Sequence, residues 1–405
     1  MEWKHYKMDE LIEEISMGPF GSDVKKEFYV DNGVPILNGS NLQGFKLQED
    51  SFGYLTKEKA DSLKKCNAHR GDIIVTHRGT LGQIVYVPVN SKYDRYVISQ
   101  SQFRFRCKAD LVDVQYLVYY FHTREGQYKI LANASQVGVP ALARATSTFR
   151  LIDINLPLLE DQRRIASILS SLDRKIELNN KINADLEEMA QAIFKNWFVD
   201  FEPFKDGKFV DSELGMIPEG WKVGTLADIA EITMGQSPAG NSLNENREGM
   251  IFYQGSSDFG FRFPSIRVFT TEPKRLAVAN SVLFSVRAPV GDINVAKEEC
   301  CIGRGVASIK SKYGHDSYLF YTMKSLHKLF DSFDGEGTVF GSINKKTLSA
   351  IQILLPSDGI VEQFNNIASS FDDRIRSLSD ENSRISTLRD TLLPRLMSGE
   401  IEVPE

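Results

Sequence analysis

The sequence lacks the short motifs by which many enzymes bind nucleotides or activate a nucleophile. It contains no G-x-x-x-x-G-K-[ST] loop for ATP phosphates and no G-x-S-x-G turn for a catalytic serine. No two prolines are adjacent, which removes the Asp/Asn-Pro-Pro-aromatic tetrapeptide with which adenine methyltransferases hold their target base. These absences predict a chain that has no catalytic activity of its own.

Metal-binding and membrane signals are also missing. Of only four cysteines, Cys66 and Cys107 stand alone, and the adjacent Cys300 and Cys301 lack the spacing of zinc ligands. The six histidines are scattered, so we expect no metal site, and so few cysteines agree with a reducing compartment. No hydrophobic run is long enough to span a bilayer, and the charged first residues do not resemble a signal peptide. We therefore expect a soluble, cytoplasmic protein without membrane contact.

The chain is long enough for more than one hydrophobic core, because 42% of its 405 residues are apolar. Its net charge of −6 comes mainly from two helical segments, while the globular segments are close to neutral. A nucleic acid would therefore have to be bound by local clusters of side chains rather than by an overall positive charge.

Residues 161–197 contain neither glycine nor proline, which predicts one helix roughly 55 Å long at ~1.5 Å per residue. Its apolar residues and two asparagines recur at intervals of four and three, the spacing of a heptad seam that requires a partner helix. The predicted seam consists of Ile165, Leu169, Leu172, Ile176, Asn179, Asn183, Leu186, Ala190, Ile193 and Trp197.

A second segment near the C-terminus repeats this pattern. Ser-Ser-Leu172-Asp173 corresponds to Ser-Ser-Phe371-Asp372, and at the same offset Asn183 corresponds to Asn382. The two asparagines either pair across the helices and fix their register or lie on an exposed flank, and we favour the first interpretation. The residues expected to set the register are Leu172, Ile176, Asn183, Leu186, Phe371, Ile375, Asn382 and Ile385.

The globular segments are duplicated as well. ISMGPFGSD in residues 1–155 corresponds to ITMGQSPAG in residues 221–356, and GDIIVTHRGTLGQIVYV corresponds to NSVLFSVRAPVGDINVA. Helical segments 156–200 and 357–405 follow the two, with a connector at 201–220. The connector ends in Ile-Pro-Glu-Gly-Trp221, which resembles the C-terminal Val-Pro-Glu joined to Met-Glu-Trp3. We predict an α+β fold in which two similar globular domains are separated by two long helices, packed as an antiparallel coiled coil, with cyclic pseudo-symmetry.

Arg78 and Arg287 follow apolar strands on equivalent turns of the two globular segments. An arginine fixed on such a turn can reach a DNA phosphate or bind a guanine with two hydrogen bonds. Alternatively, it orders its own loop by binding carbonyl groups. Two polar loops offer further donors and acceptors for base edges; alternatively, these loops are only solvated. The complete set of candidate DNA-binding residues is Asn38, Ser40, Asn41, His77, Arg78, Thr80, Gln254, Ser256, Ser257, Ser285 and Arg287.

The segment LPLLEDQRRIASILSSLDRKIELNNKINADLEEMAQAIFKNWFVDFEPF resembles the central conserved region of the DNA-specificity subunit of Type I restriction-modification systems. FSVRAPVGDINVA and TLRDTLLPRLMSGEI resemble the second recognition domain and the distal conserved region of that family. The second helix departs from the pattern, because it begins LLPSDGIVEQF in place of LPLLEDQR.

This resemblance implies a non-catalytic subunit with target-recognition domains at 1–155 and 221–356, each reading one part of a split, asymmetric sequence in double-stranded DNA. The helices would recruit two methyltransferase subunits, which bind S-adenosylmethionine and modify adenine, and the complex would add two restriction subunits that use ATP and Mg. No cofactor is expected in this chain. A coiled-coil scaffold that displays two protein-binding domains, without DNA specificity, is the alternative.

Overall fold

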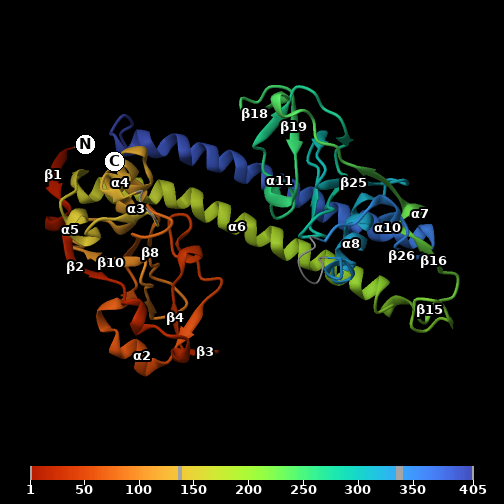
Figure 1. The fold of residues 1–405 in the computed structure, drawn as a ribbon, viewed down its shortest axis with the longest axis horizontal. Coiled ribbons are helices and arrows are strands. Elements are labelled where there is room, and N and C mark those ends of the chain that lie inside the picture. The colour runs from red at the N-terminus through yellow and green to blue at the C-terminus, as the bar shows by residue number, and fades with distance from the viewer. Residues whose placement is uncertain (1, 136–138, 334–340, 404–405) are drawn as a thin grey trace. The chain divides into compact units, whose positions relative to one another are not determined.

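The computed structural model describes residues 2–135, 139–333 and 341–403, and the chain divides into two compact units. Unit 1 consists of Met1–Glu177 with Asn382–Glu405, and unit 2 of Leu178–Glu381. The long helices α6 (Leu159–Phe198) and α11 (Asp358–Met397) each contain 40 residues and each contribute one end to either unit (Figure 1). The helix predicted at 161–197 is therefore confirmed.

The remaining elements of unit 1 are β1 (Trp3–Lys7), α1 (Met8–Leu11), β2 (Ile12–Met17), β3 (Tyr29–Val30), β4 (Val34–Ile36), β5 (Gly53–Leu55), α2 (Lys57–Ser62), β6 (Asn67–His69), β7 (Ile73–Thr76), β8 (Ile84–Tyr86), β9 (Arg95–Val97), β10 (Gln102–Cys107), α3 (Val114–His122), α4 (Arg124–Leu131), β11 (Ala134–Ser135), β12 (Ala141–Leu142), α5 (Ala145–Arg150) and β13 (Asp153–Pro157).

The remaining elements of unit 2 are β14 (Phe209–Val210), β15 (Ile217–Pro218), β16 (Lys222–Thr225), α7 (Leu226–Ile229), β17 (Ala230–Met234), β18 (Leu243–Asn244), β19 (Met250–Tyr253), β20 (Val268–Thr270), β21 (Leu276–Ala277), β22 (Val282–Ser285), β23 (Ile293–Val295), β24 (Cys300–Ile302), β25 (Val306–Ser311), α8 (Asp316–Ser325), α9 (His327–Asp331), α10 (Lys345–Ser349) and β26 (Gln352–Leu355).

The two units share one sheet topology. The four-stranded antiparallel sheet β2-β10-β7-β8 of unit 1 corresponds to β17-β25-β22-β23 of unit 2. The five-stranded sheet β3-β5-β4-β9-β6 corresponds to β18-β20-β19-β24-β21, and in both the pairing of the third and fourth strands is parallel. The predicted internal duplication and the α+β class are confirmed by this shared order.

Strand β10 illustrates how the sequence builds these sheets. Its side chains alternate, so Phe103 and Phe105 enter the hydrophobic core of unit 1 while Arg104 lies on the other face. There the buried Arg104 guanidinium is neutralised, because Nη1 lies 3.2 Å from Asp72 Oδ2 and Nη2 lies 2.6 Å from Glu14 Oε1. A buried arginine needs such partners, since an unpaired charge is costly to bury.

The apolar segment at 113–131 forms two helices, α3 and α4. Thr123 ends the first and caps the second, because its hydroxyl accepts a hydrogen bond from Gly126 N at 3.1 Å. Gly126 also lies so close to the preceding turn that an added Cβ would meet Tyr120 O at 2.3 Å. The cap and this close approach explain why the apolar spacing does not continue as a single helix.

Each unit completes its core with the ends of both long helices. Leu169 of α6 and Leu396 of α11 join the core of unit 1, while Phe194 of α6 and Phe364 of α11 join that of unit 2. In unit 1, Gly399 lies against the Trp3 ring, and in unit 2, Trp221 packs against Phe204 of the connector. The tryptophan at the start of each globular domain thus packs against the segment that follows a long helix, α11 in unit 1 and α6 in unit 2. Cyclic pseudo-symmetry requires this correspondence.

The helices form an antiparallel pair in each unit, and none of the predicted register residues is fully exposed. In unit 1, Asp173 accepts a hydrogen bond from Arg389 at 2.7 Å, and in unit 2, Asn179 Nδ2 donates to Glu381 Oε2 at 2.8 Å. Asn183 is buried, but Asn382 belongs to the other unit, so their pairing stays a prediction. Ile375 is also buried, and the half-buried register residues are Leu172, Ile176, Leu186, Phe371, Asn382 and Ile385.

Candidate nucleic-acid interface

The β7–β8 turn of unit 1 and the β22–β23 turn of unit 2 present Arg78 and Arg287 to solvent from equivalent places. Each arginine forms an isolated antiparallel bridge with the segment that precedes the last helix of its globular domain, Arg78 with Ala141 and Arg287 with Ser342. The structure therefore confirms that the two turns are equivalent. Whether the arginines bind bases or phosphates stays a prediction.

Hydrogen bonds within each turn fix its conformation. In unit 1, Thr76 N donates to Gln83 O at 2.9 Å, and in unit 2, Ser285 N donates to Asp292 O at 2.8 Å. The Ser285 hydroxyl donates to Arg287 O at 2.9 Å, and the residue is only 2% exposed. Ser285 thus acts as an internal brace of its turn, and its burial does not support the predicted DNA contact.

His77 is also engaged inside the protein. Its Nε2 donates to the carbonyl of Gln100 at 3.2 Å, and its main-chain N donates to Ser101 O at 2.8 Å. Burial is the main cause that lowers the pKa of His77 from its ordinary value of 6.5, and the neighbouring Arg78 charge lowers it further. The imidazole is therefore neutral at neutral pH, and the positive charge of this turn comes from Arg78. Thr80, on the same turn, is exposed.

The polar loop at 38–41 lies beside this turn. Gln83 Nε2 donates to Gly39 O at 3.0 Å, which joins the loop to the end of the β7–β8 connection. Asn38 and Ser40 are exposed, and Asn38 Oδ1 accepts a hydrogen bond from Ser40 N at 2.8 Å. Asn41 is only 1% exposed, and its Nδ2 donates to the main-chain carbonyls of Gln48 and Ser51. Asn38 and Ser40 remain accessible for DNA, whereas Asn41 holds the loop.

The loop at 254–257 has the equivalent place in unit 2. Gln254 and Ser257 are exposed and Ser256 is half-buried. This loop approaches the 303–305 segment so closely that a Cβ on Gly303 would meet Gln254 Oε1 at 2.5 Å. The same segment binds the arginine-bearing turn, because Val286 N donates to Gly305 O at 3.0 Å. The predicted loop and the predicted turn are therefore neighbours in unit 2, as they are in unit 1.

Two further groups belong to these clusters but were not predicted. In unit 1, Gly18 N donates to Gln102 O at 2.8 Å and brings the exposed Phe20 to the cluster. In unit 2, the Ser237 hydroxyl donates to Gln254 and lies 3.3 Å from the main-chain N of the exposed Arg304. The Met-Gly pair repeated at 17–18 and 234–235 was the signal that could have pointed to both loops.

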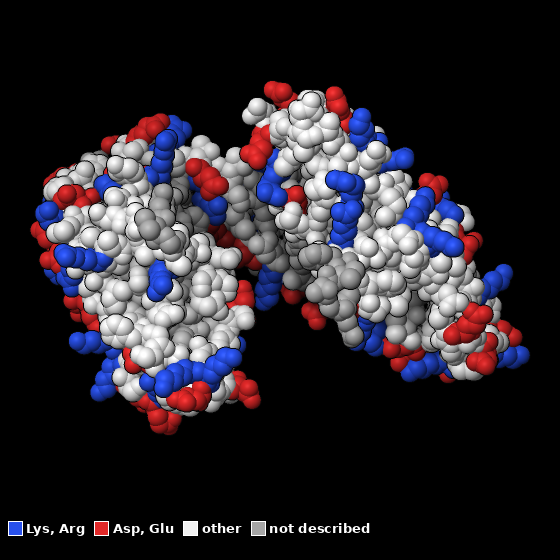
Figure 2. Space-filling view, viewed as in Figure 1, with Lys and Arg blue, Asp and Glu red and all other residues white. Residues whose placement is uncertain are grey.

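The charged side chains do not form one continuous basic surface. In the view of Figure 2, the faces turned to the reader are mostly uncharged, with lysines and arginines at separate places. This distribution agrees with DNA contacts made by local groups such as the two turns. In the described ranges, no set of three or more His, Cys, Asp or Glu side chains is arranged to hold a metal ion. No helix in those ranges combines the length and apolar character that a membrane crossing requires.

Comparisons with known proteins identify relatives over nearly the whole chain. The family model described as the Type I restriction modification DNA specificity domain matches residues 1–188 and 218–387. The chain is 30% identical over 409 residues to a Methanocaldococcus jannaschii protein assigned as the type I restriction enzyme MjaX specificity subunit, covering 99% of this chain and 94% of the relative.

Two other comparisons agree with this similarity. The chain is 25% identical over 477 residues to the type I restriction enzyme HindI specificity subunit of Haemophilus influenzae, covering 99% of this chain and all of the relative. The crystal structure of a Type-I restriction-modification system S subunit from M. genitalium has a TM-score of 0.58 at 17% identity, covering 98% of this chain and 96% of that chain. The crystal structure supports the fold alone, because its sequence identity is low.

Proposed function

The chain belongs to the Type I restriction modification DNA specificity family, and from this premise we propose that it reads a DNA target in two separate parts, one with each unit. As a specificity subunit it is the DNA-recognition part of a Type I restriction-modification system and is not itself an enzyme. The observation that carries the proposal is the pair of exposed arginines, Arg78 and Arg287, on equivalent turns of a duplicated fold.

Each turn is suited to a DNA groove because an arginine can bind the O6 and N7 atoms of a guanine together, or a phosphate. The neighbouring exposed side chains differ between the units, with Asn38 and Ser40 in one and Gln254 and Ser257 in the other. Different donors and acceptors on the same backbone frame would select different bases. We therefore propose that the two parts of the target differ in sequence.

The long helices also support a proposal about protein partners. Met189 on α6 is 51% exposed, and Leu388, at the equivalent position of α11, is 48% exposed. Apolar side chains exposed at equivalent positions of the two helices would offer two copies of one protein partner the same kind of contact. We propose that these helix surfaces recruit two methyltransferase subunits and that the complex also takes two restriction subunits.

The cofactors belong to those partners in this proposal. S-adenosylmethionine would be bound by the methyltransferase subunits, and ATP and Mg by the restriction subunits, while this chain supplies the DNA sequence preference. Because the complex acts on cellular DNA, we propose a cytoplasmic location.

The proposal is tested by selecting DNA from a randomised pool with the full chain in complex with its methyltransferase subunits. We expect the retained DNA to contain two short conserved sequences separated by a spacer of constant length and variable sequence. Retention that does not depend on DNA sequence would contradict the proposal and favour the alternative of a scaffold that displays protein-binding domains.

A further inference from the structure

Arg262 links the second globular domain to both long helices within unit 2 by hydrogen bonds and ion pairs. It lies between the 254–257 loop and β20, and its side chain is only 2% exposed. Its Nη1 donates to Asp372 Oδ1 on α11 at 2.6 Å, and its Nη2 lies 3.0 Å from Glu187 Oε2 on α6. The same Nη2 donates to the Tyr321 hydroxyl on α8 at 3.0 Å. A single side chain from a loop therefore reaches three helices.

This cluster is electrically balanced. Lys324 forms a second ion pair with Glu187, so two cations face two carboxylates in a largely buried place. The Arg262 guanidinium also lies 4.0 Å above the ring centre of Phe320. Removal of Arg262 would leave the buried Glu187 with Lys324 alone and the half-buried Asp372 without a guanidinium partner, an arrangement that disfavours the observed packing.

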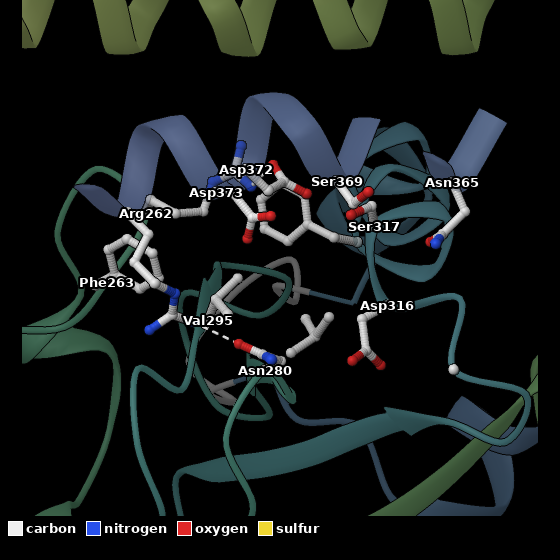
Figure 3. A pocket seen from close by; sticks show the side chains of 14 residues that line it. Arg262, Phe263, Asn280, Val295, Asp316, Ser317, Asn365, Ser369, Asp372 and Asp373 are labelled. Atoms are coloured by element: carbon white, nitrogen blue, oxygen red, sulfur yellow. Dashed lines mark hydrogen bonds and ion pairs between the residues drawn. The ribbon is translucent and has the colours of Figure 1, made fainter. Parts of the chain in front are cut away.

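Figure 3 shows the cavity beside this cluster, with Ser369, Asp372 and Asp373 on α11 along one side and Asn280 on the opposite side. The cavity has a volume of about 170 Å³. The corresponding cavity of unit 1, between its globular domain and α6, has a volume of about 860 Å³. The cavity beside Arg262 is thus the smaller of the two.

The two units share the tyrosine that binds the helix aspartate, but they differ in the arginine that binds the same aspartate. In each, a tyrosine donates to an aspartate at equivalent positions, Tyr119 to Asp173 in unit 1 and Tyr321 to Asp372 in unit 2. In unit 1 the guanidinium that binds the aspartate belongs to Arg389, which comes from α11. In unit 2 it comes from the globular domain itself. The aspartate of unit 2 is therefore linked by this arginine to the globular domain, whereas that of unit 1 is linked by its arginine to the other long helix.

The loop that carries Arg262 is connected to the predicted DNA-binding segments of the same unit. Val295 N, on the strand that follows the Arg287 turn, donates to Arg262 O at 2.8 Å. Asn294 binds Gly260 from both of its amide atoms, with Nδ2 donating to Gly260 O at 2.8 Å. A change in the position of Arg262 would therefore also shift β23 and the 254–257 loop, because these hydrogen bonds connect them to the loop that carries Arg262.

We propose that Arg262 is a positioning residue for DNA recognition, which fixes the orientation of the second globular domain on α6 and α11. This inference rests on the proposed two-part reading of DNA. Arg262 is buried and does not itself reach a base. Its loss should therefore leave the base preference in each half-site unchanged. It should widen the range of spacer lengths between the half-sites that the complex binds.

The test uses the full chain in complex with its methyltransferase subunits and a series of DNA duplexes that keep both half-sites and vary the spacer by single base pairs. For Arg262→Met, we expect binding to extend to neighbouring spacer lengths, with unchanged base selection in both half-sites. Arg262→Lys should give an intermediate range, because lysine keeps the charge but lacks the fork that reaches two carboxylates. Arg275→Met is the matched control, since Arg275 is an exposed arginine of the same unit and lies outside the 254–257 loop and the Arg287 turn.

Glu187→Gln provides a milder second variant, because it leaves the bonds of Arg262 to Asp372 and Tyr321 in place. It should broaden the spacer range in the same direction, including when Arg262→Met does not fold. An unchanged, narrow range in folded Arg262→Lys and Glu187→Gln complexes would overturn the inference alone. A parent complex without any two-part preference would overturn the proposed function, and the inference with it.

Discussion

Replacement of Arg287 by alanine should impair the reading of one half of the DNA target and leave the fold intact. The turn is held by the Ser285 hydroxyl and by the hydrogen bond of Ile343 N to Val286 O, neither of which involves the guanidinium. The arginine is exposed, so its removal buries no unpaired group and opens no cavity. The variant should therefore unfold at the same temperature as the parent, which thermal melting would verify before binding is measured.

The expected size of the effect depends on what the guanidinium touches. A guanine bound by two hydrogen bonds is worth about 1 to 3 kcal/mol of discrimination. Since each 1.4 kcal/mol is a factor of ten, the preference for that base should fall by about 5- to 150-fold. A phosphate contact would instead weaken all sequences equally and reduce the slope of binding against salt concentration by about one.

Selection from a randomised DNA pool, followed by binding titrations at several salt concentrations, distinguishes these cases. We expect relaxed base preference confined to one half-site for Arg287→Ala and to the other half-site for Arg78→Ala. Relaxation of both half-sites by either variant would refute the assignment of one half-site to each unit. A uniform loss with unchanged preference would refute the base contact and assign the arginine to phosphate.

Two further predictions concern stability, and both are measured by thermal unfolding of the full chain. Gly18→Ala should destabilise unit 1 by about 1 to 3 kcal/mol, because the new Cβ would meet Ser99 O at 1.9 Å. Gly240→Ala is the control and should have little effect, because the space around Gly240 is open. Equal melting temperatures of the two variants would contradict this prediction. His77 and His122 have pKa values lowered mainly by burial, so the unfolded chain binds protons more readily as the pH falls through their ordinary value of 6.5. Unit 1 should therefore lose stability from about pH 7.5 to 5.5, a loss that His122→Gln should reduce, and a pH-independent melting temperature across this window would refute it.

The long helices and the duplication could be predicted because local sequence determines them. Heptad spacing in both segments, together with the absence of glycine and proline from 161–197, indicates helices whatever their surroundings, and all register residues proved to be at least partly buried. The equivalence of Arg78 and Arg287 followed from their similar strand-turn-strand settings. The bridges to Ala141 and Ser342 show that the same long-range neighbours surround both.

The roles of individual polar residues could not be predicted in this way. In the sequence, Asn41 and Ser285 cannot be distinguished from the accessible polar residues beside them, and only the three-dimensional fold shows that they are buried. Arg262 gave no signal at all, because its partners Glu187 and Asp372 are 75 and 110 residues away in the sequence. Such attachments depend on tertiary packing, which neither periodicity nor composition encodes.

The central claim is that each unit reads its own part of one DNA target, and the most direct measurement is a map of methylated adenines in DNA from cells that express this chain with its methyltransferase subunits. We expect methylation at a single motif made of two short sequences with a fixed spacer. Expression of Arg78→Ala should relax one sequence of the motif, and expression of Arg287→Ala the other. A continuous motif, or relaxation of the same sequence by both variants, would contradict the claim.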